Sequence, residues 1–115
     1  MNIILFDQSD YYQGKDIIRL SDYRFDHISK VIKAKTNDPL KTGLINGNWG
    51  TGKVLEINNQ FIDILVNLDR TPPSPSPLTL LLALPRPKIL KRTLKHITTI
   101  GVKNIYLILL FIIFF

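Results

Sequence analysis

Short apolar runs separated by turn residues fill positions 1–70 and predict a mostly β region. Several runs alternate between apolar and polar positions, which is typical of strands that bury one face. Asn-Gly at 46–47 and Asn-Asn at 58–59 favour tight turns between consecutive strands. We therefore expect strands at residues 2–6, 17–20, 40–45, 53–57 and 61–68.

One helix interrupts the predicted strands. Ile28, Val31 and Ile32 recur at i, i+3 and i+4, the spacing that places side chains on one face of an α-helix. The Ser-Asp pair at 21–22 can cap its amino terminus, and Asn-Asp-Pro at 37–39 is a stop signal. We expect the three apolar side chains to share one face of this helix.

The segment TPPSPSP at 71–77 predicts a boundary. Its four prolines cannot donate ladder hydrogen bonds or continue a helix, so we expect a stiff, extended linker outside any sheet. This interpretation divides the chain into a small β-barrel domain at 1–70, a linker at 71–77 and a second region at 78–115.

Beyond the linker the periodicity changes. Residues 78–84 form a continuous apolar run, the pattern of a strand covered on both faces, and Leu90, Leu94 and Ile97 then recur at helical spacing. Gly101 stands where a glycine commonly ends a helix, and the apolar run NIYLILL follows. Strand, helix and strand predict a right-handed parallel βαβ unit, the opening of an α/β domain, so the chain is α+β overall.

The stretch NGNWGTGKV at 46–54 raises the question of a nucleotide-binding P-loop. Gly47, Gly52 and Lys53 match its spacing, but the motif also needs a Ser or Thr hydroxyl for Mg²⁺ and a helix after the loop. The last position is valine here, and the residues that follow predict a hairpin. We interpret the stretch as a β-turn. Trp49 and Lys53 remain candidates for contact with a partner, with a core position as the alternative for Trp49.

The net charge of +6 is unevenly distributed. Residues 1–70 carry nine Lys or Arg and nine Asp or Glu, whereas residues 71–115 carry six Lys or Arg and no acidic residue. A basic segment of this kind favours a polyanionic partner, either nucleic acid or an anionic membrane face. The alternative is that balancing acids belong to the remainder of a larger domain.

Several classes of site are not predicted. The chain has no cysteine, which excludes disulfides and Cys-ligated metals. His27 and His96 lie on opposite sides of the linker, and no acidic cluster has metal-binding or acid–base spacing, so we predict no metal site and no catalytic residue. The first ten residues lack the positive region of a signal peptide, and we expect a cytoplasmic protein.

The apolar run IYLILLFIIFF at 105–115 admits three interpretations. A membrane-spanning helix needs about 20 residues, so we expect no membrane anchor. The run is interpreted as a strand of an incomplete sheet. As an alternative, residues 109–115 arise from a shifted reading frame.

Taken in order, these motifs resemble the bacterial ribosomal RNA small subunit methyltransferase E family, the uracil-N3 methyltransferases, over about the first 108 residues. The segment RFDHISKVIKAKTNDPLKTGLINGNWGTGKVLEI is similar to the family's pattern, with matches at Arg24, His27 and Asp38. The segment LTLLLALPRPKILKRTLKHITTIGVKNIYLI resembles the family's strand, Pro-Lys loop, amphipathic helix and following turn.

The sequence departs from the family at four places. Lys33 occupies a position where the family has Arg, and it lacks the bidentate fork of a guanidinium. Asn37 occupies a position where the family usually has glycine. Thr99 stands where the family usually has Glu. After IYLI the family continues with polar and charged residues, whereas this sequence reads LLFIIFF and ends. We therefore expect a chain truncated at its carboxyl end.

The resemblance implies a PUA-like β-barrel that helps to hold RNA, followed by the first βαβ unit of a SPOUT-type α/β knot domain. It implies S-adenosylmethionine-dependent methylation of uridine N3 in the 16S RNA of the small ribosomal subunit, usually by a homodimer. The family's cofactor-binding knot is missing here, so we expect this chain to bind no S-adenosylmethionine and to be inactive alone. A non-catalytic RNA-binding fragment is the alternative function.

Basic side chains are the candidates for RNA contact, because phosphate neutralisation dominates RNA affinity. The second predicted helix interleaves them, together with His96, with its apolar stripe. An ordinary solvated helix face is the alternative, and His27 is interpreted as a packing or capping residue. The candidates are Arg19, Arg24, Lys33, Lys35, Arg86, Lys88, Lys91, Arg92 and Lys95.

Overall fold

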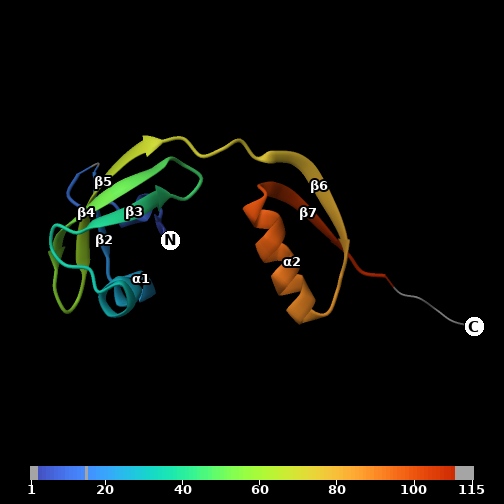
Figure 1. Cartoon of the computed structure of the whole chain (residues 1–115), viewed down its shortest axis with the longest axis horizontal. Helices are drawn as coiled ribbons and strands as arrows, with labels where there is room; N and C mark the ends of the chain where they lie inside the picture. Colours follow the sequence, from blue (N-terminus) through green and yellow to red (C-terminus); the bar gives the residue numbers. More distant parts are fainter. Residues whose placement is uncertain (1–2, 15, 111–115) are drawn as a thin grey trace, which may run out of the picture. The chain divides into compact units, whose positions relative to one another are not determined.

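The computed structural model describes residues 3–14 and 16–110. Tertiary contacts divide the chain into two compact units, Met1–Pro72 and Pro73–Phe115, each with a sheet of its own (Figure 1). The division falls within the proline-rich segment. Residues 105–108 of the apolar tail lie in a strand, as one interpretation holds, whereas residues 111–115 lie outside the described residues, so the interpretations of that last part stay predictions.

Unit 1 is built on a five-stranded sheet with the strand order β1-β3-β4-β5-β2. β1 and β3 are parallel, and the other neighbouring strands are antiparallel. β1 and β2 stand at the two ends of this order, so the described sheet is a curled half-barrel rather than the closed barrel that we predicted (Figure 1). The strands are β1 (Ile3–Phe6), β2 (Ile17–Leu20), β3 (Pro39–Leu44), β4 (Trp49–Ile57) and β5 (Ile62–Arg70).

The inner face of this sheet forms the core of unit 1. Alternate residues of the strands point inward, and Phe6, Ile18, Val54 and Ile64 are fully buried. The apolar surface that they remove from water drives folding at roughly 25 cal/mol per Å². The alternation confirms that these are strands with one buried face.

The helical segment of unit 1 is shorter than predicted. α1 (Tyr23–His27) is capped by Asp22, whose carboxylate accepts a 2.9 Å hydrogen bond from the backbone N–H of Arg24. A single π-helical turn, η2 (Ile28–Ile32), follows directly and ends at Lys33, which has a left-handed φ of 56°. The cap at Asp22 is thus confirmed, but the segment ends before the predicted stop signal at 37–39.

The π-helical turn also changes which residues face the core. Ile28 is fully buried, whereas Val31 is 65% exposed. A π-helix is wider than an α-helix, so residues three apart no longer share a face. The prediction that Val31 shares a face with Ile28 was wrong because it assumed α-helical geometry.

The glycine-rich stretch is mostly strand. The backbone turns between Leu44 and Asn48, whose N–H and C=O groups are joined by a 3.0 Å hydrogen bond, and β4 begins at the next residue. A β-carbon on Gly50 would lie 1.9 Å from the carbonyl oxygen of Asn67, so only glycine allows β4 and β5 to approach this closely. Since a strand and not a helix follows, the context of a P-loop is absent, and the predicted turn is confined to its first residues.

Unit 2 consists of β6 (Ser76–Ala83), α2 (Pro87–Thr99) and β7 (Val102–Ile108). β6 and β7 are parallel neighbours, with α2 between them in the chain. Gly101 ends α2 as predicted: its φ is +79°, and its N–H donates to the carbonyl of Thr98 at 3.1 Å. The assignment of this unit to a SPOUT-type domain stays a prediction.

One expectation for this region, that residues 71–77 lie outside any sheet, was wrong. β6 begins inside the predicted linker, because Ser76 donates to the carbonyl of Gly101 at 2.8 Å and Pro77 lies within the strand, at an irregularity of its register. Proline is tolerated at such a position because no regular ladder bond is lost. The paired residues Leu81 and Tyr106 are 65% and 60% exposed, so the described part of this sheet is not covered on both faces.

Candidate nucleic-acid interface

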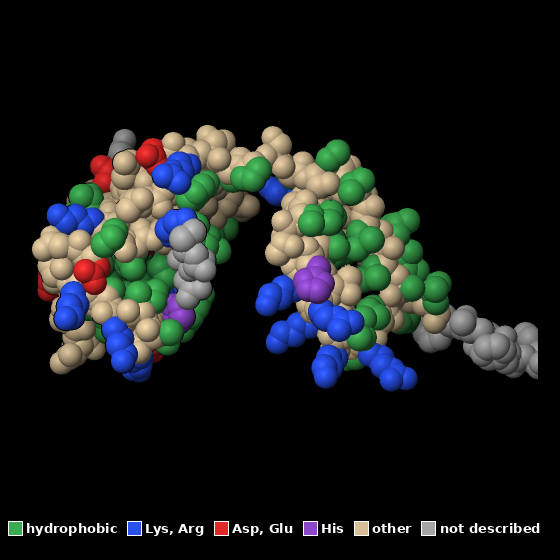
Figure 2. Space-filling model, in the orientation of Figure 1, with side chains coloured by type: hydrophobic (Ala, Val, Ile, Leu, Met, Phe, Trp, Pro, Cys, Tyr) green, Lys and Arg blue, Asp and Glu red, His purple; other side chains and the backbone are tan. Residues whose placement is uncertain are grey.

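The strongest concentration of positive charge lies on α2. Leu90, Leu94 and Ile97 are partly buried, and the basic residues between them are exposed. The predicted stripe and the predicted basic face are therefore separate surfaces of one helix, and the Lys and Arg side chains of α2 project together into solvent (Figure 2). The exposed residues are Arg86, Lys88, Lys91, Arg92, Lys95 and His96.

The clustering of like charges on one face destabilises α2. Lys88 and Arg92 are four residues apart, as are Lys91 and Lys95, and each like-charged pair costs about 0.2–0.5 kcal/mol. Arg86 at the N-cap and Lys88 in the first turn also meet the positive end of the helix dipole. A polyanion bound along this face would relieve both costs.

Arg24, by contrast, has its guanidinium fully engaged within unit 1. It donates two 2.7 Å hydrogen bonds to the carboxylate of Asp10, bonds Asp22 at 2.7 Å and reaches the carbonyl of Leu5 at 3.1 Å. These contacts raise the pKa of Arg24, chiefly through the hydrogen bonds to Asp10. Arg24 thus ties α1 to the 3-10 helix η1 (Gln8–Asp10) and to β1. Its contact with RNA stays a prediction.

Arg19 is held in a similar way on the outer face of the sheet. Its guanidinium forms two 2.7 Å hydrogen bonds with Asp63, its register partner on β5. The guanidinium carbon lies 3.6 Å from the ring centroid of Tyr12 and 3.7 Å from that of Phe61. Salt bridge and stacking together hold this side chain, and its contact with RNA also stays a prediction.

Lys33 and Lys35 lie where the helical segment of unit 1 ends. Both are exposed, and the backbone N–H of Lys35 donates to the carboxylate of Asp38 at 2.8 Å. These two lysines lie in unit 1 and the basic face of α2 in unit 2. The predicted residues are therefore distributed over two units.

A further group, on the outer face of the unit 1 sheet, was missed in part by the sequence interpretation. Trp49 is partly exposed, so the alternative of a core position is wrong. The ammonium nitrogen of Lys41 lies 5.5 Å from the Trp49 ring centroid, and the guanidinium carbon of Arg70 lies 4.9 Å from it. The three residues come from β3, β4 and β5, and only the strand register brings them together.

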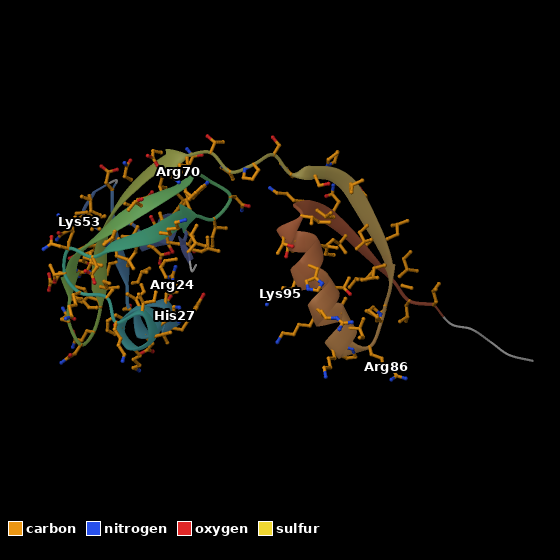
Figure 3. All side chains as sticks on the ribbon, viewed as in Figure 1. Arg24, His27, Lys53, Arg70, Arg86 and Lys95 are labelled. Carbon is orange, nitrogen blue, oxygen red and sulfur yellow. The ribbon has the colours of Figure 1, made fainter. Side chains whose placement is uncertain are left out.

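An open groove of about 510 Å³ lies between β1 and α1. Figure 3 shows Arg24 and His27 beside it, and Ile3, Leu5 and Tyr23 contribute exposed apolar surface. Since the charge of Arg24 is already paired, the groove is mainly apolar. Nothing in its lining favours a phosphate.

At positions 3–14 and 16–110, no three His, Cys, Asp or Glu side chains gather as a metal site would require. Over the same residues, no helix combines the length and the apolar character that a bilayer crossing needs.

The fold occurs in solved methyltransferase structures. One is ribosomal RNA small subunit methyltransferase E from Neisseria gonorrhoeae bound to S-adenosylmethionine, with a TM-score of 0.66, 17% identity and coverage of 94% of this chain and 45% of that one. The crystal structure of a hypothetical protein has the same fold, with a TM-score of 0.71 and 13% sequence identity. The match covers 92% of this chain and 45% of the chain of that protein. No protein-family model matches the sequence.

The sequence relationship is more specific. Over 109 residues, 94% of its length, the chain is 31% identical to ribosomal RNA small subunit methyltransferase E of Treponema pallidum. It spans 41% of the length of that relative. The resemblance found in the sequence is therefore confirmed: nearly the whole chain is similar to part of ribosomal RNA small subunit methyltransferase E.

Proposed function

We propose that this chain is the RNA-holding part of an S-adenosylmethionine-dependent methyltransferase whose full-length relatives modify N3 of a uridine in small-subunit ribosomal RNA. The relationship to the Treponema pallidum protein supports the substrate class. The curled sheet of unit 1 then corresponds to a PUA-like domain, and β6, α2 and β7 correspond to the start of a SPOUT-type domain. Homodimerisation and a cytoplasmic location belong to the same proposal.

We propose that the cofactor site lies outside this chain, because the segment that follows unit 1 lacks acidic residues. S-adenosylmethionine carries an ammonium and a sulfonium charge and ribose hydroxyls, for which acidic side chains are the usual partners. Residues 71–115 contain no acidic residue. We therefore assign no catalytic step to this chain and propose that its own contribution is to bind RNA.

The basic face of α2 carries this proposal. RNA is the polyanion that matches its like-charged pairs and its basic amino-terminal end. Binding to phosphates releases counterions, so the affinity must fall as salt rises. For single strands the slope of log K against log salt is about −0.7 per neutralised phosphate.

The test is fluorescence anisotropy with a labelled fragment of small-subunit ribosomal RNA at several salt concentrations. A variant with Lys91→Ala, Arg92→Ala and Lys95→Ala is expected to bind more weakly, with a slope reduced by about two. The matched control keeps the charge, with Lys91→Arg, Arg92→Lys and Lys95→Arg, and should retain the slope. An alanine variant with an unchanged slope would show that α2 does not contact the RNA.

A further inference from the structure

The outer face of the unit 1 sheet carries an apolar platform around Gly43. A β-carbon at this position would lie 3.0 Å from Cδ1 of Ile3, 3.4 Å from Cδ2 of Leu5 and 3.4 Å from Cβ of Trp49. The glycine thus brings the side chains of β1 close to Trp49 on β4, across β3. Ile3 and Leu5 are 42% and 50% exposed, so the platform is open to solvent.

Cations flank this platform. Lys41 and Arg70 both lie within cation–π distance of the Trp49 ring, and Lys53 is exposed further along the same face of β4. Asp69 is the nearest acid to Arg70, but their 3.9 Å contact is between two exposed side chains and is worth little. The cations therefore remain available to a ligand.

The two cations lie over the Trp49 ring, and proteins that bind single-stranded nucleic acid combine aromatic side chains with cation–π contacts and a positive surface. A base that stacks on the ring would displace the cations from its face, and the displaced cations could then contact the phosphates on either side. A purely apolar partner would leave Lys41 and Arg70 without counter-charges, and a free phosphate would make no use of the ring. The combination favours an unpaired nucleotide segment over both.

We propose that Trp49, with Lys41 and Arg70, forms a base-stacking site for single-stranded RNA on the outer face of the unit 1 sheet. The inference rests on the proposed function for its ligand class, but it uses different residues from the basic face of α2. The site reads no particular base, because every base offers a π-face to the ring. Its role is to hold an unpaired segment of the RNA.

The chain contains a single tryptophan, so its intrinsic fluorescence reports on this site alone. Titration of the full chain with oligouridylate should change the Trp49 emission in a saturable way. Inorganic polyphosphate of the same charge should change it far less, since it offers no base. Equal changes with both ligands, or no change with RNA, would overturn the proposal and point to a protein partner or to simple ion binding.

Variants then test the contribution of the ring to affinity. Trp49→Leu should weaken oligouridylate binding, measured by anisotropy, by about tenfold, while Trp49→Phe keeps an aromatic face and should retain most of the affinity. Equal affinities of the Leu variant and the unchanged chain for oligouridylate would refute the base-stacking site at Trp49. The Phe variant serves as the folded reference if the Leu variant is unstable.

A final comparison separates this inference from the proposed function. In the Lys91, Arg92 and Lys95 alanine variant, the fluorescence response of Trp49 to oligouridylate should persist. If α2 proves irrelevant to RNA but this response remains, the proposed function fails in its α2 assignment alone. If the response is absent while α2 still binds RNA, only the stacking site is wrong.

Discussion

Arg24 and Asp10 face each other through two parallel hydrogen bonds of 2.7 Å, which join α1 to η1. Both side chains are largely buried, with 18% and 11% of their surfaces exposed. A charge pair in this setting is costly to break on one side only, because the remaining charge is left buried and unpaired. The pair therefore acts on the stability of unit 1.

Replacing Arg24 tests this role. Arg24→Ala should lower the free energy of unfolding by about 3 kcal/mol, since Asp10 and Asp22 both lose their partner. Urea denaturation gives the change. The control is Lys30→Ala, which removes an exposed ion pair with Asp26 and should cost less than about 1 kcal/mol. Similar losses for the two variants would contradict a structural role for Arg24.

Acid should destabilise unit 1 through the same cluster. The hydrogen bond from Arg24 is the main cause that holds the pKa of Asp22 below its ordinary value of 3.8. A lowered pKa in the folded state means that this stabilisation is complete above pH 3.8 and is lost as the pH falls through the folded pKa. Urea midpoints should thus be level near neutral pH and fall in acid. Asp22→Asn keeps the cap and should show a smaller acid-dependent loss.

A substitution at Lys33 is expected to stabilise the protein, because the backbone of this residue is in a left-handed conformation. A left-handed conformation costs a non-glycine residue about 1 kcal/mol, so Lys33→Gly should raise the free energy of unfolding by about 0.5–1 kcal/mol. Lys30→Gly, within η2, should lower it by a similar amount. If Lys33 contacts RNA, the stabilised variant will also bind RNA more weakly, which anisotropy measures. A loss of stability at Lys33 would contradict the observed φ.

Glycines 50 and 43 should respond differently to an added methyl group. Gly50→Ala forces a backbone carbonyl to move and should cost about 3 kcal/mol or more. Gly43→Ala meets the ends of the Ile3 and Leu5 side chains at 3.0 and 3.4 Å and Cβ of Trp49 at 3.4 Å, with no backbone atom among them, and should cost less than about 1 kcal/mol. Thermal unfolding of both variants gives the comparison. Equal effects would mean that β4 and β5 do not approach each other as described.

The cofactor provides a test that does not depend on RNA. Isothermal titration calorimetry of this chain with S-adenosylmethionine should give no saturable heat, because residues 71–115 offer no acidic partner for its charges. A full-length relative is the positive control. Clear binding by this chain would refute our view that the cofactor site lies outside it.

Much of the fold could be predicted because local patterns determine it. The strand at 17–20, the cap at Asp22 and the glycine after α2 each depend on a few neighbouring residues, and all three are found. The π-helical turn could not be predicted, since its residues also fit an α-helix. The entry of Pro77 into β6 depends on pairing with a distant strand, which the local sequence does not show.

The candidate interface also has one part that local sequence predicts and another that depends on the fold. The basic face of α2 follows from helical spacing and could be listed before the structure was known. The roles of Arg19 and Arg24 could not, because Asp63 and Asp10 lie far from them in sequence and reach them only through the fold. The grouping of Lys41, Trp49 and Arg70 likewise requires the register of three strands.

The pairing of β2 with β5 joins residues near position 20 to residues near position 62, with β3 and β4 between them in the chain. During translation, therefore, β2 cannot pair with β5 until nearly all of unit 1 has been synthesised. Protease protection of ribosome-bound chains of increasing length should appear only once β5 has emerged. The nascent protein then passes through a stage in which its first strands are exposed without their final partners.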